Sequence, residues 1–310
     1  EVFVRDHDLP LRNRETGSEL RLSGGGDEKQ TWSDRVFWSP DSKRLVAWRT
    51  RRGAKHTVYM VESSPKKQLQ PKLHSHHYLK PGDEIPLTRP HLFDVSSGRE
   101  IPVSDKLFAN PWRVRELRWN KAGDRFTFRY NQRGHQVLRL IEVDAHGGAA
   151  RAVIEETSKT FIDYAYKQFL FYLDDSEELL WMSERDGWNH VYLYDARTGK
   201  VKNQVTRGRW VVRGIERIDV KSRRLWFRAS GLAEGEDPYH VHFCRIDFDG
   251  SNLVRLTSGD GTHQVRYSPG AGYLVDTWSR VDQPPGTGPR HFCFHPNLDV
   301  VYFSNEQGSS

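Results

Sequence analysis

The sequence has 310 residues with 36% hydrophobic and 12% aromatic side chains, which is enough to bury a substantial core. Its formal net charge is +6, but the basic residues are spread among 41 acidic ones, so we expect no nucleic acid as a partner. Two cysteines are too few for a disulfide framework, and no apolar run is long enough to predict a membrane-spanning segment.

A recurring hairpin is the first organising feature of the chain. Each copy is an apolar strand that ends in Asp or Asn, followed by Gly three or four residues later and then by a second strand. Glycine suits these turns because it adopts positive φ at little cost. The copies occupy residues 9–23, 91–104, 139–154, 191–206 and 242–257, and the glycines Gly98, Gly148, Gly199 and Gly250 are 50, 51 and 51 residues apart.

A second repeated feature lies about halfway between these hairpins. It is a turn signal followed by an apolar run, at residues 38–48, 119–130, 173–182, 218–227, 267–278 and 295–303. This pattern predicts an all-β fold, a β-propeller of four-stranded blades with about six blade equivalents. The ring would be either incomplete or closed again with fewer blades. An irregular β-sandwich would explain the short strands but not the constant period.

One interval between the hairpins is longer than the others. Gly17 and Gly98 are 81 residues apart, and an insertion at 63–90 explains the excess. The insertion contains His74 and His76, which would lie on the same side of an extended strand, so a metal pair is one interpretation. Because no Cys or carboxylate follows at ligand spacing, we expect no metal. We interpret 63–90 as an exposed loop that docks on a neighbour.

Motifs for catalysis are missing from the sequence. The G-x-S-x-G nucleophile elbow does not occur, and no alternation of strands and helices is predicted that would carry it. The glycine-rich stretch 24–27 lacks the Lys and the following helix of a phosphate-binding loop. We therefore expect no catalytic residue and no cofactor, and we expect the chain to be inactive on its own.

Turns at the ends of propeller strands are where we expect contacts with a substrate. Arginine binds peptide carboxylates or carbonyls, and tryptophan covers apolar side chains. The alternative is that these turns only bond to neighbouring blades. The candidates in the turn at 183–190 are Glu184, Arg185, Trp188 and His190, and those in the turn at 130–136 are Asn131, Arg133 and His135.

Several long motifs occur in order along residues 1–284, among them WSPDSKRLVAWR, WNKAGDRFTFRYNQRGHQ and WMSERDGWNHVYLYD. Together they resemble the amino-terminal propeller of dipeptidyl peptidase IV-like serine peptidases, in the prolyl oligopeptidase group. In that family an eight-bladed propeller caps an α/β-hydrolase domain with a Ser, Asp and His triad and restricts which peptides enter. The resemblance implies a non-catalytic propeller that gates and positions peptide for a hydrolase domain absent from this chain.

The resemblance has further implications for location and specificity. It implies an extracytoplasmic location and allows a homodimer. Tyr166, in the stretch 161–167, lies roughly where family members place side chains that extend the substrate pocket. Family members that release dipeptides carry paired glutamates just before the position of 36–40. The stretch 27–35 has no such pair, so dipeptide release does not follow from the resemblance.

The last stretch of the sequence follows a different pattern. Residues 288–310 resemble a blade of phosphogluconolactonase-type seven-bladed propellers, which carry a GPRH…FHP…Y…NE pattern. We therefore predict two parts, a dipeptidyl peptidase IV-type propeller over 1–284 and lactonase-like terminal strands over 285–310. The lactonase-like site candidates are Arg290, His291, His295 and Glu306.

Two other functions stay open beside the peptidase interpretation. A free-standing propeller would serve as a scaffold for protein interactions. A lactonase-like hydrolase would instead act through the residues of the last stretch. A test for hydrolysis of a peptide anilide and of a lactone separates these hypotheses, because the peptidase interpretation predicts neither activity for the chain alone.

Overall fold

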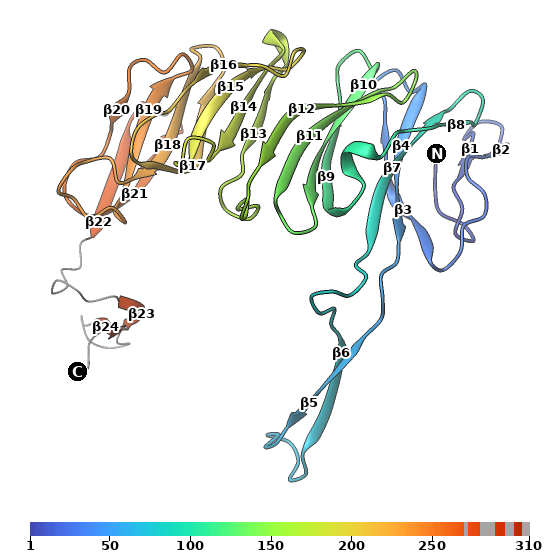
Figure 1. Cartoon of the computed structure of the whole chain (residues 1–310), viewed down its shortest axis with the longest axis horizontal. Coiled ribbons are helices and arrows are strands. Elements are labelled where there is room, and N and C mark those ends of the chain that lie inside the picture. The colour runs from blue at the N-terminus through green and yellow to red at the C-terminus, as the bar shows by residue number, and fades with distance from the viewer. Residues whose placement is uncertain (270–271, 280–288, 295–300, 306–310) are drawn as a thin grey trace. The chain divides into compact units, whose positions relative to one another are not determined.

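The computed structural model describes residues 1–269, 272–279, 289–294 and 301–305, the last two ranges as backbone only. Nearly every element is a strand (Figure 1). The chain divides into two compact units. Unit 1 is Glu1–Arg185 with Leu193–Lys202, and unit 2 is Asp186–Tyr192 with Asn203–Ser310.

Four sheets in the described part of the chain have four strands each (Figure 1). In three of them, the strands follow one another across the sheet in the order of the sequence, which is the arrangement of a propeller blade. The four sheets are β3 (Gln30–Trp38), β4 (Arg44–Arg51), β7 (Leu87–Asp94) and β8 (Glu100–Ile101); β9 (Pro111–Trp119), β10 (Arg125–Gln132), β11 (Val137–Asp144) and β12 (Ala150–Thr157); β13 (Leu170–Leu173), β14 (Glu178–Ser183), β15 (His190–Asp195) and β16 (Val201–Gln204); and β17 (Val211–Asp219), β18 (Arg224–Ser230), β19 (Val241–Asp247) and β20 (Val254–Arg255).

The other described sheets have two strands. They pair β1 (Pro10–Arg12) with β2 (Glu19–Arg21), β5 (Thr57–Glu62) with β6 (Lys72–His77), β21 (Thr262–Tyr267) with β22 (Leu274–Ser279), and β23 (Pro289–Phe294) with β24 (Val301–Asn305). Two short 3-10 helices are η1 (Lys106–Phe108) and η2 (Asp174–Ser176). No helix in the described ranges is long and apolar enough to span a membrane. The predicted all-β fold with four-stranded, blade-like sheets is confirmed.

The repeated hairpin turn is closed by the Asp that ends its first strand. Asp94 Oδ1 accepts hydrogen bonds from the backbone N–H and the hydroxyl of Ser97, both at 2.9 Å. Asp195 Oδ1 accepts the same two bonds from Thr198, at 2.7 and 3.0 Å. The hydroxyl of Ser96, followed by the Ser97 bonds, lowers the pKa of Asp94 to about 2. The Asp therefore stabilises the turn as an ionised acceptor.

Glycine in the same turn is needed for two reasons. Gly98, Gly148 and Gly199 have φ of +68°, +72° and +71°, which a residue without a Cβ adopts most easily. A Cβ at Gly148 would also lie 2.0 Å from the carbonyl oxygen of Pro102, and one at Gly199 would lie 2.4 Å from that of Val153. These turns pack directly on the backbone of the preceding sheet, which explains the constant spacing of the glycines.

The core of unit 1 fills the space between neighbouring sheets. Val46 and Leu92, from β4 and β7, pack in one buried cluster with aromatic side chains of β10. Phe128 is fully buried there and contacts the ring of Trp48 edge-on at 6.0 Å between centroids and that of Phe108 at 5.1 Å. Burying one such ring contributes about 1.5–3 kcal/mol. Neither sheet could hide its apolar face without the other.

The insertion in the first four-stranded sheet is a β-hairpin rather than a loop. Figure 1 shows β5 and β6 projecting from the sheet of β3, β4 and β7. The hairpin begins at Thr57, before the predicted start of the insertion. His74 Nε2 lies 2.9 Å from a carboxylate oxygen of Glu62 across the hairpin. The described residues contain no group of three or more His, Cys, Asp or Glu that could bind a metal.

Some predictions concern parts of the chain that the structure does not describe. The predicted boundary at 284/285 lies in 280–288, outside the described residues. His295 and Glu306 also lie outside them, and Arg290 and His291 lie in β23, whose side chains are not described. The two-domain division, the closure of the ring and the lactonase-like candidates stay predictions.

Candidate functional site

A polar pocket of about 230 Å³ lies in unit 1, between β9, β10 and β11 and the segment that precedes β13. We call it the arginine pocket. Most of the side chains that line it carry hydrogen-bond donors, and Leu138 among them is apolar and buried. The lining residues are Arg113, Arg115, Arg129, Asn131, Leu138, Tyr164, Ala165 and Gln168. None of the three arginines was among the residues proposed from the sequence.

A β-bulge in β9 shapes the pocket. Arg129 pairs with Arg115 across the strands while Thr127 pairs with Arg118, so β9 has one more residue than β10 in this interval. Glu116 is in that interval and has φ of +59°, a conformation that costs a non-glycine residue about 1 kcal/mol or more. Bulges of this kind redirect side chains next to functional sites. Here the bulge brings the Glu116 carboxylate to both neighbouring guanidinium groups.

Charge in the pocket is not balanced. Glu116 forms ion pairs with Arg129 and with Arg115, whose Nε lies 3.4 Å from Oε1. Arg113 has no ion pair with any described residue. Burial lowers the pKa of Arg129; the nearby Glu116 raises it and the nearby Arg115 lowers it. Two guanidinium groups therefore share one carboxylate and the third has none, an arrangement that favours binding of an additional anion.

Two donors in the pocket lack acceptors. Arg129 is only 6% exposed, and its Nε has no hydrogen-bond partner among the described residues. Gln168 accepts a bond of 2.9 Å from Arg115 Nη2, but its own Nε2 has no partner there either. Buried donors without acceptors destabilise a fold by about 1–3 kcal/mol each, so each one that occurs needs a physical explanation.

An aromatic wall closes one side of the arginine pocket. The ring of Tyr164 stacks on that of His135, with centroids 4.1 Å apart and 19° between planes. Phe161 and Trp112 contact the same imidazole edge-on. His135 Nδ1 lies 3.2 Å from the side-chain oxygen of Asn131, and burial lowers the pKa of the imidazole. His135 therefore orients two lining residues rather than lining the pocket itself.

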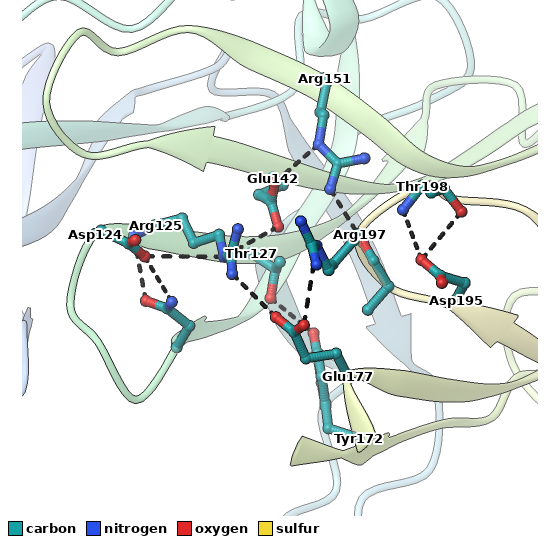
Figure 2. Close-up of polar contacts among 12 residues, drawn as sticks. Asp124, Arg125, Thr127, Glu142, Arg151, Tyr172, Glu177, Asp195, Arg197 and Thr198 are labelled. Atoms are coloured by element: carbon teal, nitrogen blue, oxygen red, sulfur yellow. Dashed lines mark hydrogen bonds and ion pairs between the residues drawn. The ribbon is translucent and has the colours of Figure 1, made fainter. Parts of the chain in front are cut away.

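A second cavity in unit 1, of about 250 Å³, is surrounded by ion pairs that we call the charged seam. Figure 2 shows its centre, where Glu142 accepts a hydrogen bond of 2.8 Å from Arg151 and lies 3.8 Å from Arg125. Glu177 lies 3.3 Å from Arg125 and 3.9 Å from Arg197 (Figure 2). Each of these guanidinium groups thus has a carboxylate partner.

The seam ties β10 to β13 as well. Thr127 Oγ1 and the Tyr172 hydroxyl are 2.7 Å apart, and burial raises the pKa of that tyrosine (Figure 2). At the edge of the seam Arg118 pairs with Asp174, and Lys121 Nζ lies 2.6 Å from Asp175. These two ion pairs connect the sheet of β9–β12 to that of β13–β16. Because its charges balance, the seam acts as a joint.

Comparison with known proteins places the chain in a family. Residues 1–285 match the family described as the dipeptidyl peptidase IV (DPP IV) N-terminal region. The chain belongs to this family. Dipeptidyl peptidase 4 of Trichophyton tonsurans is 23% identical over 307 residues, which cover 91% of this chain and 39% of that protein. This DPP IV-type region therefore spans about two fifths of the length of the curated relatives that it matches.

Solved structures agree with the fold. The crystal structure of Porphyromonas gingivalis dipeptidyl peptidase 4 is similar with a TM-score of 0.65 and 20% identity, over 90% of this chain and 40% of that one. A putative dipeptidyl aminopeptidase IV from Bacteroides ovatus is similar with a TM-score of 0.58 and 16% identity, over 91% of this chain and 42% of that one. At these identities the likeness shows the fold of the DPP IV-type region alone.

Several candidates predicted from the sequence lie near the arginine pocket of this DPP IV-type region. Tyr166 is 86% exposed and follows Ala165, which lines the pocket. The next residue, Lys167, binds Glu184 at 2.6 Å, so the structure brings Tyr166 and Glu184 close together. Asn131 lines the pocket itself. Substrate contact by Tyr166 and Glu184 stays a prediction.

Other candidates have structural partners. Arg133 Nη2 donates a bond of 2.6 Å to the carbonyl oxygen of Asp83, at the base of the projecting hairpin. Arg185 contacts Glu156 and the hydroxyl of Tyr194, and burial raises the pKa of that tyrosine to about 12. These two arginines already serve acceptors of the protein, which was the alternative weighed for such turns.

The candidates in unit 2 differ from one another in exposure. His190 is fully buried, with Nδ1 3.0 Å from Thr206 Oγ1 and Nε2 3.0 Å from the carbonyl oxygen of Gly208. A fully buried imidazole with both nitrogens bonded does not face a substrate, so for His190 the structure supports a structural role. Trp188 is 38% exposed, and its contact with substrate stays a prediction.

Proposed function

We propose that this DPP IV-type region gates and positions peptide substrates for an α/β-hydrolase domain and does not cleave peptide bonds itself. The observation that carries the proposal is the match of residues 1–285 to the N-terminal region of a peptidase family, in a chain that covers 39% of a curated relative. The sequence has no G-x-S-x-G elbow that would supply a nucleophile. Positioning is thus the chemistry that these residues can perform.

The arginine pocket supplies suitable groups for positioning. A peptide backbone offers carbonyl acceptors, and guanidinium groups present several donors in a planar fork. Arg113 and Arg115 lie two residues apart on β9, so they fall on the same face of the strand outside the bulge. Tyr164 offers an aromatic surface for an apolar side chain beside them. A bound peptide would therefore contact the ring of Tyr164 and the guanidinium donors of Arg113 and Arg115.

The test combines an activity assay with a binding measurement on the whole chain. We expect no turnover of a Gly-Pro anilide, and measurable calorimetric binding of a neutral, amidated proline-containing peptide. Tyr164→Ala should weaken that binding about two- to tenfold, because one aromatic contact is worth about 0.5–1.5 kcal/mol. Tyr239→Ala, at a tyrosine that is 82% exposed in unit 2, is the matched control.

Turnover by the purified chain would contradict the non-catalytic part of the proposal. Absence of any peptide binding, or equal binding by the Tyr164 variant and the wild type, would contradict the positioning part. Lactone turnover would instead support the lactonase hypothesis for the last stretch of the sequence.

We also propose that the region forms a homodimer through the projecting hairpin. Tyr59, Val61 and Leu73 are 66%, 65% and 64% exposed. Val61 is paired with Leu73 across the hairpin, and Tyr59 lies two residues from Val61, so all three side chains lie on one face. An isolated two-stranded ribbon with an exposed apolar face is marginally stable in water. A second copy of the same hairpin would cover that face.

Sedimentation of the full chain tests the dimer. Val61→Lys combined with Leu73→Lys should convert dimers to monomers while the far-UV circular dichroism stays that of the wild type. Val58→Lys with His76→Lys, a second cross-strand pair of the hairpin, is the control. A monomeric wild type, or a dimer that the first double variant leaves intact, would contradict this part.

A further inference from the structure

In the arginine pocket, positive charge exceeds the supply of acceptors. In the charged seam each guanidinium group lies within ion-pair distance of a carboxylate, and Glu142 and Glu177 are each shared by two arginines. In the pocket Glu116 is shared by Arg115 and Arg129, and Arg113 has no carboxylate among the described residues. The pocket therefore lacks at least one anion that the same kinds of residue have in the seam.

Part of this excess positive charge is buried in the fold rather than exposed on the surface. Arg129 is 94% buried, given its exposure of 6%, and it lines the pocket with an Nε that has no acceptor. Gln168 adds a second donor without a partner. Every unsatisfied group here is an N–H, so the missing partner is an acceptor. A carboxylate supplies two acceptor oxygens and a negative charge in one planar group, which matches a guanidinium fork.

Comparison with another sheet shows that the repeat alone does not produce a buried arginine at this position. In the sheet of β17–β20, Arg228 corresponds to Arg129, and its Nε is paired with Glu216 at 2.6 Å, one position along β17 from the counterpart of Glu116. There the arginine side chain is 45% exposed, against 7% for Arg129. The difference lies in the connection to the next sheet. It has twelve residues between β12 and β13 and six between β20 and β21.

The longer connection supplies the pocket wall. Its residues 158–169 include Tyr164 and Gln168, which cover the arginines. The enclosed volume of about 230 Å³ is smaller than the roughly 300–1,000 Å³ of sites for drug-sized ligands, so one side chain or chain end fits rather than a whole peptide. The geometry is that of a subsite for a single carboxylate.

We propose that the arginine pocket binds a carboxylate of the peptide substrate, so that this DPP IV-type region favours peptides with an acidic side chain or with a free carboxyl terminus in reach. The inference rests on the proposed substrate-positioning function. Arg113 and Arg115 would bind the carboxylate at the open side of the pocket, and Arg129 would add charge from below. Repulsion between Arg115 and Arg129, which already lowers the pKa of Arg129, would be offset by the bound anion.

Calorimetry with the full chain and three matched peptides tests the proposal. The first peptide is neutral and amidated, the second differs by one internal Glu, and the third differs by a free carboxyl terminus. We expect at least one carboxylate peptide to bind about tenfold tighter than the neutral one. The second and third peptides distinguish a side-chain carboxylate from a terminal one. The advantage should shrink between 50 and 500 mM salt, both concentrations being our choice of conditions.

Variants at the open side of the pocket sharpen the test. Arg113→Met and Arg115→Met should each remove the tenfold advantage, so that the carboxylate peptides bind the variant no more tightly than the neutral peptide binds the same variant. Arg228→Met, at the corresponding arginine in the sheet of β17–β20, should keep the advantage. Thermal melts of the variants check that they are folded. Arg113 and Arg115 are exposed enough to be replaced without creating a cavity in the core.

The outcomes separate this inference from the function on which it rests. Equal binding of all three peptides would overturn carboxylate recognition and leave peptide positioning intact. Binding of glutarate, lost in Arg115→Met, without binding of any peptide would support a carboxylate site and overturn peptide positioning. Binding of neither glutarate nor any peptide would overturn both.

Discussion

The arginine pocket and the charged seam both include side chains of β10, but they differ in how positive and negative charges are balanced. On β10, Thr127 lines the seam and Arg129 lines the pocket, two residues apart and on the same face. Each cation of the seam has a carboxylate within ion-pair distance, whereas in the pocket Arg115 and Arg129 share one carboxylate and Arg113 has none among the described residues. The number of acceptors, rather than the number of arginines, therefore decides whether a charged site joins two sheets or binds a ligand.

Exposure decides how much each contact contributes. Exposed ion pairs contribute about 0–1 kcal/mol, because water and salt screen them. Shielded pairs interact more strongly, but the loss of hydration offsets much of that gain, and removing one partner leaves an uncompensated charge. Glu142, with a side chain that is 16% exposed, belongs to the shielded class, and Asp175, at 88%, to the exposed one.

The largest effect is expected at the residue between the two sites. Phe128 lies between Thr127 and Arg129 on β10 but points to the opposite face, into the buried cluster. Phe128→Ala should lower the free energy of unfolding by about 3–5 kcal/mol, because a buried ring is replaced by a cavity. Urea unfolding measures this, and Phe161→Ala, at a ring that is 53% exposed, is the control. A loss below about 1 kcal/mol would show that β10 is not held by this core.

The second largest effect is expected in the charged seam, from the loss of a carboxylate that two arginines share. Glu142→Ala removes the acceptor of Arg151 and the neighbour of Arg125, and we expect a loss of about 1–2 kcal/mol in unfolding free energy. Because both arginines are more than one third exposed, water partly compensates them. Asp175→Ala should cost less than about 0.5 kcal/mol. Equal losses in the two variants would remove the distinction between shielded and exposed pairs of the seam.

In the pocket the same kind of change should cost little stability. Arg129→Met removes a buried guanidinium that Arg115 repels and that has an Nε without an acceptor, and it leaves Glu116 45% exposed to water. We expect the free energy of unfolding to change by less than about 1 kcal/mol, since apolar replacements of buried ions are often neutral or stabilising. A loss above about 2 kcal/mol in urea would mean that the pocket is a joint like the seam.

The smallest predicted effect is a pH dependence at the pocket wall. Burial lowers the pKa of His135 from its ordinary 6.5, so the unfolded chain takes up a proton there more readily than the folded chain. The stability contributed by neutral His135 is therefore present above pH 6.5 and is lost as pH falls through the lowered pKa. The drop in melting temperature between about pH 7.5 and 5 should be smaller in His135→Phe than in the wild type.

The control for this pH effect is His77→Gln, at a side chain that is exposed on the hairpin. Its pH dependence should equal that of the wild type. The residues that line the cavity of the charged seam include no histidine, so no matching effect is expected from that site. An unchanged pH dependence in His135→Phe would show that the imidazole titrates normally and does not support the wall.

The repeat and the class of fold followed from the sequence because both depend on local physics. An Asp that caps its own turn and a Gly with positive φ act within a few residues, as Asp195 and Gly199 show. Alternating apolar residues predict strands, and sheets too small to stand alone predict neighbours. The family resemblance extended this reasoning to a peptidase region, and the match over 1–285 confirmed it.

The functional candidates were harder to predict because they depend on segments distant in the sequence. His190 was a candidate for substrate contact from its place in a turn, but it is fully buried and bonded to Thr206 and Gly208. Arg113 and Arg115 lie two residues apart on β9, a spacing that places both side chains on one face of the strand. Nothing local indicated which of the many arginines would lack a carboxylate.

The repeated four-stranded sheets of this chain follow from turn chemistry and strand periodicity, which are properties of neighbouring residues. The places where charge is left uncompensated depend instead on how distant segments meet in the folded chain. One bulge at Glu116 and one long connection carrying Gln168 determine the partners of Arg115 and Arg129. Electrostatic balance is a sum over everything within a few ångströms, and that neighbourhood exists only after the chain has folded.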